Sequence, residues 1–193
     1  MAILYENRVL DRLQSTTGIA RVLEIGGGIG AIAYLMMAKV KDVRYVIVDL
    51  PESLAFSAVY LNVLFPELQN HFVTNLDELI VHDTPGFTFI PNDLHRELTG
   101  RGQTYELAMN TASMREMTVN QVDDYCRTLS QLLGGVGVFF EQNHAADPGR
   151  GDIDTASVIG RHFHNRLDCQ TPIAKASTHG IARLWSNPSQ SGV

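Results

Sequence analysis

Glycines at alternate positions follow a short apolar run near the start of the chain, and an acidic residue stands just before them. The run is Val22 to Ile25, the acid is Glu24, and the glycines are Gly26, Gly28 and Gly30. Glycine adopts positive φ easily and lets a ligand approach the backbone closely. A helix that begins after such a turn presents free N–H groups and a partial positive charge. The pattern predicts a strand, a turn and a helix, with a nucleotide-like ligand at the strand's carboxyl end.

Two classes of ligand fit this turn. Gly26, Gly28 and Ala31 have the G-x-G-x-x-A spacing of a dinucleotide site. Glu24 favours another class, because a carboxylate gains nothing beside an anionic pyrophosphate but attracts a ligand with an ammonium and a sulfonium centre. A glycine turn without a ligand is the third interpretation, although glycines there lower stability without a use.

The next apolar run, Arg44 to Leu50, predicts a second strand that ends in Asp49. An acid at that place, about 20 residues after the turn, can accept hydrogen bonds from both hydroxyls of a ribose. Leu50 would then pack on the adenosine. The alternative is a carboxylate at a helix N-terminus, since Pro51 suits the first helical position.

A third predicted strand, Phe87 to Pro91, ends in Asn92 and Asp93. A carboxylate at that strand end can accept a bond from an adenine amino group, so both residues are candidate ligand contacts, Asp93 first. The alternative is a turn in which Asp93 caps the segment Leu94 to Leu98. The two interpretations stay open.

Alternating strand and helix signals predict one α/β domain with a doubly wound, mostly parallel sheet. We expect an N-terminal helical region over residues 1–18, the ligand-binding domain over 19–187 and a flexible tail over 188–193. Weaker signals suggest a strand near residues 71–73, a short helix or turn over 76–81 and a mobile loop over 145–153, and residues 163–174 stay ambiguous. The clearer helices are expected over 2–14, 29–40, 51–65 and 119–133, and the clearer strands over 22–25, 44–50, 87–91, 105–110, 137–141 and 181–186.

Composition narrows the class of protein. The net charge is −6 and there is no basic run, which argues against a nucleic-acid partner. Cys126 and Cys169 form no metal pattern and are expected to be free thiols in a reducing compartment. There is no apolar stretch of the ~20 residues that a membrane helix needs and no signal peptide, so we expect a cytoplasmic protein without a membrane partner.

Three stretches carry a resemblance to known proteins. The first, residues 22–30, resembles the first motif of class I S-adenosylmethionine (SAM) dependent methyltransferases. The second, residues 46–52 with Tyr60 and Leu61, is similar to many small-molecule O-methyltransferases. The third, residues 110–117, resembles the bacterial sugar O-methyltransferase family. The resemblance covers roughly residues 21–143.

The resemblance implies a seven-stranded Rossmann-like fold whose last strand is antiparallel, and methyl transfer from SAM to a hydroxyl of a sugar unit in a glycan or glycosylated natural product. Members usually carry a long region before the first strand, which this chain lacks. Either it is a truncated catalytic domain or a partner, such as a second copy in a homodimer, completes the substrate site. By motif position the cofactor-binding residues would be Glu24, Gly26, Gly28, Gly30, Asp49, Leu50 and, beside the methionyl part, Asn110.

A sugar hydroxyl is a weak acid, so a general base is expected. Glu116 and His144 are the candidates, since they follow the fourth and fifth predicted strands at the cleft. Glu116 could instead be a helix N-terminal carboxylate, and His144 an exposed loop residue. The acidic residues of the chain do not suggest a metal site, so no bound metal is predicted.

Two other functions compete with a methyltransferase. The first is an NAD-dependent oxidoreductase that uses the same glycine turn, which Glu24 and the short chain disfavour. The second is a non-catalytic module of the SAM-binding fold, completed by a partner.

Overall fold

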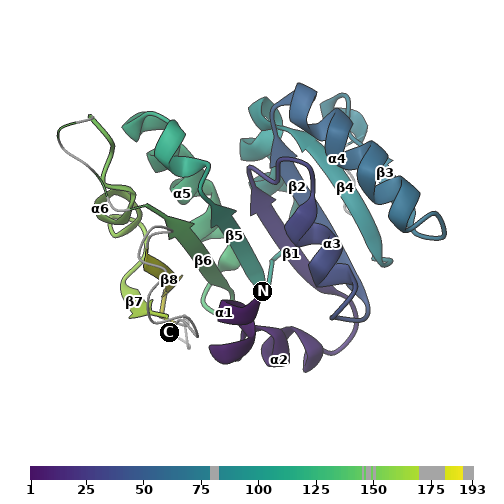
Figure 1. Ribbon diagram of the computed structural model, residues 1–193, viewed down its shortest axis with the longest axis horizontal. Helices are drawn as coiled ribbons and strands as arrows, with labels where there is room; N and C mark the ends of the chain where they lie inside the picture. The colour runs from purple at the N-terminus through teal and green to yellow at the C-terminus, as the bar shows by residue number, and fades with distance from the viewer. Residues whose placement is uncertain (79–82, 145, 147–148, 150, 170–180, 189–193) are drawn as a thin grey trace.

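The computed structural model describes residues 1–78, 83–144, 146, 149, 151–169 and 181–188 (Figure 1). In that part of the chain, eight strands form one sheet in the order β3-β4-β2-β1-β5-β6-β8-β7. Neighbouring strands are parallel except β8, which is antiparallel to both β6 and β7. The strands are β1 Ala20–Ile25, β2 Val43–Asp49, β3 Gln69–Phe72, β4 Gly86–Pro91, β5 Leu107–Thr111, β6 Val138–Asn143, β7 Asn165–Asp168 and β8 Ile181–Ser186.

Helices cover both faces of the sheet, and successive strand residues point to opposite faces. On β2, Tyr45 and Ile47 join the core under the first four helices, whereas Val46 and Val48 join the core under the later ones. The predicted doubly wound, mostly parallel sheet is therefore confirmed, with one strand more than expected. The helices are α1 Ala2–Glu6, α2 Val9–Gln14, α3 Ala31–Met37, α4 Pro51–Leu64, α5 Val119–Leu133 and α6 Thr155–Ile159, with the 3-10 helices η1 Leu76–Glu78, η2 Asn92–Arg101 and η3 Met114–Glu116.

The added strand is β3, at the sheet edge beside β4. Arg44 is fully buried and donates hydrogen bonds to the carbonyl oxygens of Phe87, at 3.0 Å, and Gln69, at 3.2 Å. A Cβ on Gly86 would overlap the Gln69 carbonyl, so only glycine lets the two strands approach at this point. The weak strand signal near residues 71–73 was thus the end of a strand that a buried arginine holds in place.

The expected single helix over residues 2–14 was wrong, because it is two short helices. Arg8, between α1 and α2, has a left-handed φ of 58°, and the Asn7 side chain donates to the Ile3 carbonyl at 2.8 Å. The break lets Leu4 reach the same core as Leu10 on α2. Figure 1 shows both helices at the amino ends of the strands, opposite the arrow tips.

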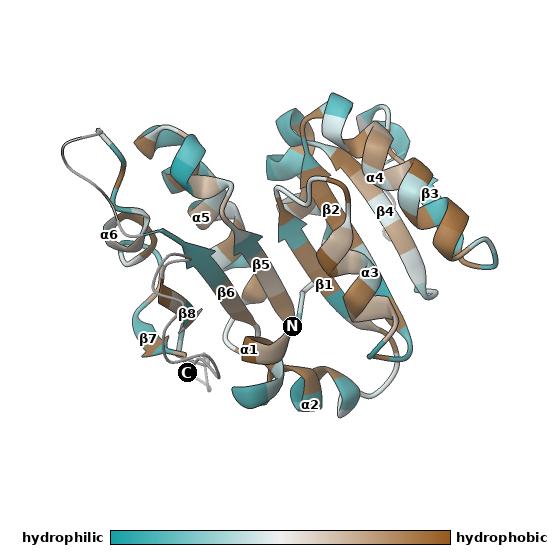
Figure 2. Ribbon diagram, viewed as in Figure 1, coloured by the Kyte–Doolittle hydropathy of each residue, from teal (hydrophilic) through white to brown (hydrophobic). Residues whose placement is uncertain are grey.

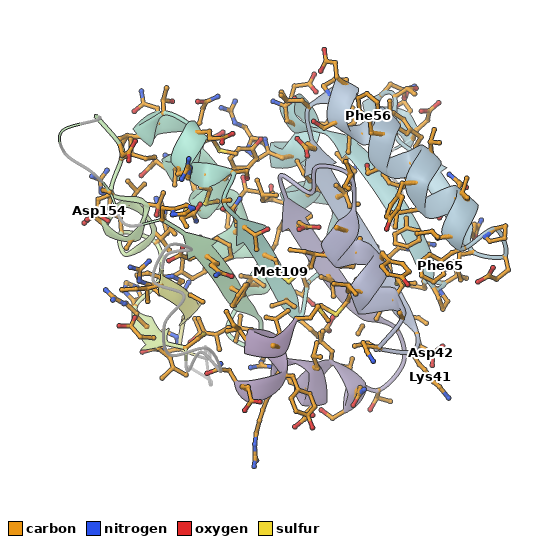
Figure 3. All side chains as sticks on the ribbon, viewed as in Figure 1. Lys41, Asp42, Phe56, Phe65, Met109 and Asp154 are labelled. Atoms are coloured by element: carbon orange, nitrogen blue, oxygen red, sulfur yellow. The ribbon has the colours of Figure 1, made fainter. Side chains whose placement is uncertain are left out.

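Helix α4 buries one face against the core. Leu54 and Leu61 are buried, and the Phe65 ring that follows the helix lies 5.9 Å from the Tyr34 ring. Figure 3 labels Phe56, in the first half of this helix, and Phe65, just after its last residue, and Phe56 is exposed. The outer face is also apolar, and Figure 2 shows brown along most of the helix.

Some of the remaining expected elements fall on described residues, and others fall on residues that the structure does not describe. The strand expected over residues 181–186 is confirmed as β8, and the helix expected over residues 119–133 has the predicted bounds as α5. Strand β7 lies within the ambiguous stretch 163–174. Parts of the expected turn, the expected loop, the ambiguous stretch and the expected tail lie outside the described residues. They are residues 79–81, 145, 147, 148, 150, 170–174 and 189–193.

The strand order reverses beside β1. From β1 the chain moves outward to β2 and β4 and then returns to place β5 on the other side of β1. Helices on either side of such a reversal leave in opposite directions, which opens a crevice at the carboxyl ends of the strands. In this fold the ligand site is therefore expected at the ends of β1 and β5.

Candidate functional site

The glycine turn between β1 and α3 uses its glycines for different reasons. Gly26, Gly28 and Gly30 have φ values of 75°, 55° and 84°, a region that glycine favours. A Cβ on Gly26 would overlap the Ser113 hydroxyl, and one on Gly30 would lie 2.9 Å from a methyl carbon of Leu61. A Cβ on Gly28 would meet no atom within 4 Å. Packing thus requires Gly26 and Gly30, whereas Gly28 leaves bare backbone facing open space.

Asp49 ends β2 beside this turn. Its Oδ2 accepts a hydrogen bond from the Gly28 N–H at 2.8 Å, and its Oδ1 accepts from the Leu50 N–H at 2.7 Å. The carboxylate therefore connects the glycine turn with the start of α4. Each oxygen still has a second lone pair, so the carboxylate can accept further bonds from a ligand.

A cavity of about 400 Å³ opens over the turn and Asp49. Such a volume is within the range of small-molecule sites. Six predicted site residues line it, namely Gly26, Gly28, Asp49, Leu50, Asn92 and Glu116. No sequence pattern indicated the other described lining residues, which are Ile25, Val48, Ser53, Ser113, Met117, Gln121 and Tyr125.

Glu24 is buried and is not among the described lining residues. Its Oε2 accepts a hydrogen bond from the Tyr45 hydroxyl at 2.9 Å and lies 3.2 Å from where a Cβ on Gly27 would be. Burial, against the lowering effect of the Tyr45 hydrogen bond and with a smaller contribution from the Asp49 charge, raises the pKa of the Glu24 carboxyl to about 7. Glu24 thus lies under the glycine turn, and its predicted contact with a ligand stays a prediction.

Asn110 is also buried, behind the cavity wall. Its Nδ2 donates to the Ile25 carbonyl at 2.8 Å and bonds the Ser113 hydroxyl, and its Oδ1 accepts from the Met114 N–H at 3.3 Å. The amide thereby fixes the ends of β1 and β5 relative to each other and holds Ser113 against the cavity. Its predicted role beside a methionyl group stays a prediction.

A chain of polar groups continues from Asn110 across the sheet. Asn143 Nδ2 donates to Asn110 Oδ1 at 3.1 Å and to Glu141 Oε2 at 3.0 Å. Arg183 donates to the other oxygen of Glu141 at 2.7 Å, and Glu141 has no exposed surface. Figure 2 shows this polar end of β6 in teal. The cavity wall is thus connected with a buried ion pair between β6 and β8.

Besides Glu24 and Asn110, three more predicted residues lie outside the described cavity lining. Gly30 packs against α4, Asp93 is exposed at the start of η2, and His144 is exposed after β6. Asp93 is the second residue of η2, whose N-cap is Pro91 without a side-chain cap bond, so the described structure does not show the cap that the alternative interpretation expected. The roles of these residues toward a ligand remain untested predictions.

The wall opposite the glycine turn comes from η2 and α5. The Asn92 side chain hydrogen-bonds the Tyr125 hydroxyl, and both residues line the cavity. Burial raises the pKa of the Tyr125 phenol to about 12, and the charge of Asp49 contributes. Helix α5 begins with a capping box in which Thr118 and Gln121 bond each other, which fixes Gln121 at the cavity. A tyrosine seven residues inside a helix gave no local signal in the sequence.

Three further observations on the described residues concern the cysteines, metal-ligating side chains and membrane-spanning helices. Cys126 and Cys169 are free thiols, as expected. Among the described positions, no three or more histidine, cysteine, aspartate or glutamate side chains are grouped to hold a metal ion. Over the same positions, no helix is both long enough and apolar enough to span a bilayer.

Comparisons with known proteins point to one fold. Neither a family model nor a curated protein sequence matches the chain. Among solved structures, the CurJ carbon methyltransferase superposes with a TM-score of 0.64 at 13% identity, over 98% of this chain and 54% of that one. The N-methyltransferase NodS from Bradyrhizobium japonicum WM9, in complex with S-adenosyl-L-homocysteine, gives 0.62 at 13% identity, over 96% and 86%.

An O-methyltransferase family protein from Burkholderia thailandensis gives a TM-score of 0.64 at 10% identity, over 98% of this chain and 58% of that one. The chain therefore spans little more than half of two of these structures and most of the third. At such identities the likeness shows the fold, which is the Rossmann-like fold found in SAM-dependent methyltransferases that act on carbon, nitrogen or oxygen.

Proposed function

We propose that this chain is a SAM-dependent methyltransferase, of the EC 2.1.1 type, and that its acceptor is a hydroxyl group, with a sugar unit as the preferred class. The observation that carries the proposal is the cavity itself. It lies at the strand reversal of this fold, and bare glycine backbone and the Asp49 carboxylate form one side of it.

The residues present fit SAM as a cofactor. A Cβ on Gly28 would meet no atom, so a ligand can lie against the backbone there. Asp49 offers carboxylate lone pairs to ribose hydroxyls, and Leu50, which is 54% exposed at the cavity, offers an apolar surface to the adenosine. Asn92 lines the same cavity at the end of β4. When bound, the sulfonium would supply an electrophilic methyl group.

Glu116 supports a hydroxyl acceptor. It lies at the end of η3 on the cavity wall, where a carboxylate can accept the proton of an incoming hydroxyl. The resemblance of residues 110–117 to sugar O-methyltransferases supports the sugar class, and the O-methyltransferase neighbour supports oxygen. The carbon and nitrogen methyltransferase neighbours make amine and carbon acceptors the alternatives to test.

Binding calorimetry tests the cofactor. We expect S-adenosylhomocysteine to bind the wild type with a dissociation constant on the order of micromolar, and NAD not to bind. Asp49→Ala should weaken binding by at least about tenfold, because two hydrogen bonds to a charged acceptor are lost. Asp11→Ala, which removes an exposed carboxylate on α2, is the matched control and should bind as the wild type does.

Other outcomes would change the proposal. If neither ligand binds, the cavity has no SAM role in this chain. If NAD alone binds, the oxidoreductase interpretation replaces ours. Binding of S-adenosylhomocysteine without methyl transfer to any acceptor would favour the non-catalytic module. Transfer of labelled methyl groups to sugars, phenols and amines then identifies the acceptor class, and transfer only to amines would refute a hydroxyl acceptor.

A further inference from the structure

The loop after β5 begins with a residue in an unusual backbone conformation. Ala112 has a φ of 66°, in the left-handed region that alanine seldom adopts. Its N–H donates to the Gln142 carbonyl oxygen at 2.9 Å, which ties the loop to β6. Residues held in this region cluster at active sites and ligand clamps, where the surrounding fold compensates for the strain. The next residue, Ser113, lines the cavity.

Buried groups determine how the Ser113 hydroxyl is hydrogen-bonded. Asn110 Nδ2 donates to Ser113 Oγ and, at 2.8 Å, to the Ile25 carbonyl oxygen. Since a carbonyl oxygen can only accept, the Asn110 amide must turn its nitrogen to this side. The Met114 N–H, which can only donate, lies 3.3 Å from Asn110 Oδ1 and requires the same orientation. The Ser113 hydroxyl therefore accepts a hydrogen bond from Asn110.

A buried ion pair requires the same orientation from the other side of Asn110. Asn143 Nδ2 donates to Asn110 Oδ1 at 3.1 Å and to Glu141 Oε2 at 3.0 Å. Glu141 is paired with Arg183 at 2.7 Å, and a carboxylate in such a pair can only accept. Glu141 thus orients two side-chain amides in succession, and both asparagines are at most 1% exposed.

The proton of the Ser113 hydroxyl is available to a ligand. Among the described residues it is donated to the Ile25 carbonyl oxygen, at 3.3 Å, whereas O–H···O bonds are typically about 2.7–2.8 Å long. That carbonyl already accepts the shorter bond from Asn110. A hydroxyl that accepts one hydrogen bond is a stronger donor in the next. Ser113 is half-buried at the cavity, so its O–H can turn toward an acceptor atom there.

The order of the strands indicates which part of a ligand reaches this hydroxyl. Strands β4, β2, β1 and β5 are neighbours in that order, and their carboxyl ends bring to the cavity, in the same order, Asn92, Asp49, Gly26 and Ser113. SAM is also built in a line, from adenine through ribose and sulfur to an amino acid. With the ribose on Asp49 and the adenine toward Asn92, the amino-acid part extends past Gly26 to Ser113.

We propose that Ser113 is a ligand-binding residue whose hydroxyl donates a hydrogen bond to the carboxylate of the amino-acid part of SAM. Of the two charged groups in that part, the ammonium can only donate and the carboxylate can only accept. A hydroxyl that Asn110 has polarised for donation fits the carboxylate. Ala112 and Asn110 are positioning residues, because they act through Ser113. The inference rests on the proposed function, since it assigns one part of the same cofactor.

Binding calorimetry with three probes tests this contact. S-adenosylhomocysteine carries the carboxylate and the ammonium, its decarboxylated analogue keeps only the ammonium, and methylthioadenosine lacks both. Ser113→Ala should weaken S-adenosylhomocysteine binding by about tenfold or more, because one hydrogen bond to a charged group is lost. It should bind the other two probes as the wild type does. Ser130→Ala, which removes a hydroxyl that donates to the Arg127 carbonyl outside the described lining, is the matched control and should change no affinity.

A second comparison needs no variant, so it does not depend on how Ser113→Ala folds. The wild type should prefer S-adenosylhomocysteine over the decarboxylated analogue by about tenfold or more, for the same reason. Equal affinity for these two probes would overturn the inference.

The remaining outcomes separate the inference from the proposed function. Equal weakening of all three probes by Ser113→Ala would mean that Ser113 only shapes the turn, and weakening of both ammonium-bearing probes would move the contact to the ammonium. Either result overturns the inference, as does wild-type affinity of Ser113→Ala for S-adenosylhomocysteine, while the proposed function stands. If the wild type binds none of the probes, the proposed function fails and the inference fails with it.

Discussion

The Ser113 hydroxyl occupies the space that a Cβ atom on Gly26 would need. Asn110 and the Ile25 carbonyl hold that hydroxyl by hydrogen bonds, so it cannot move aside freely. The glycine turn and the loop after β5 are therefore packed against each other at one atom. The first glycine of the turn is required by a neighbour in the fold as well as by any ligand.

Substitution of this glycine tests that packing. Gly26→Ala should lower the free energy of unfolding by about 3 kcal/mol, because a positive φ costs about 1–2 kcal/mol and the overlap adds a similar amount. Gly28 also has a positive φ, but a Cβ there would meet no close atom. Gly28→Ala should therefore lower the free energy of unfolding only by the cost of the positive φ. Urea denaturation measures both. Gly26→Ala/Ser113→Gly should recover the overlap part, and equal losses in the two single variants would contradict this account.

Glu24 should make stability depend on pH. The unfolded carboxyl titrates near 4.5 and the folded one near 7. Between these values the folded state binds the extra proton, so this group's contribution to the free energy of unfolding falls by about 3 kcal/mol as pH rises through the window. The wild type minus Glu24→Gln difference, from urea denaturation at pH 4.5 to 8, should show that fall. A difference that does not change with pH would disprove it.

Tyr45 gives a companion test. Its hydroxyl donates to Glu24, and a bond to a charged acceptor is stronger than one to a neutral carboxyl. Tyr45→Phe should therefore cost about 1 kcal/mol more at pH 8 than at pH 5. The same loss at both pH values would mean that Glu24 stays protonated up to pH 8.

The buried ion pair of Glu141 and Arg183 should contribute more to the free energy of unfolding than the exposed ion pair of Arg166 and Asp168. Arg183→Met leaves the Glu141 charge without its partner inside the sheet, which should cost about 3–5 kcal/mol. Glu141→Gln/Arg183→Met should recover much of that loss. Arg166→Met, which removes an exposed ion pair with Asp168, should cost less than about 1 kcal/mol. Thermal unfolding of the three variants checks this order.

Glu116 and His144 should differ in their effect on turnover. Glu116 lines the cavity and His144 is exposed outside it. With an accepted substrate, Glu116→Gln should lower kcat by about 100-fold or more at unchanged affinity for S-adenosylhomocysteine. His144→Gln should change kcat by less than about threefold. The reverse order would assign the base to His144.

The sequence predicted the parts of the site that local patterns encode. A strand, closely spaced glycines and an acid at the next strand end identify Gly26, Gly28 and Asp49, because each residue acts through backbone geometry close to it in the chain. These local patterns did not predict the face of the sheet to which the Glu24 side chain points. Residues alternate along β1, so Glu24 points to the face of Tyr45, whereas its neighbours Leu23 and Ile25 join the other core.

The opposite wall could not be read from the sequence. Tyr125 and His95 are far apart in the chain and meet because η2 packs on α5. Strand β3 also depends on a residue far away in the chain, because the buried Arg44 donates a hydrogen bond to its short polar sequence. The break at Arg8 also depends on the shape of the core rather than on the apolar spacing of residues 2–14.

The order of the lining residues has a consequence for synthesis. All described lining residues lie between Ile25 and Tyr125, before β6, β7 and β8. A chain emerging from the ribosome therefore carries every one of them before the strands of the closing edge are synthesised. A ligand that binds this nascent cavity would stabilise it by mass action while the rest of the protein is still being made.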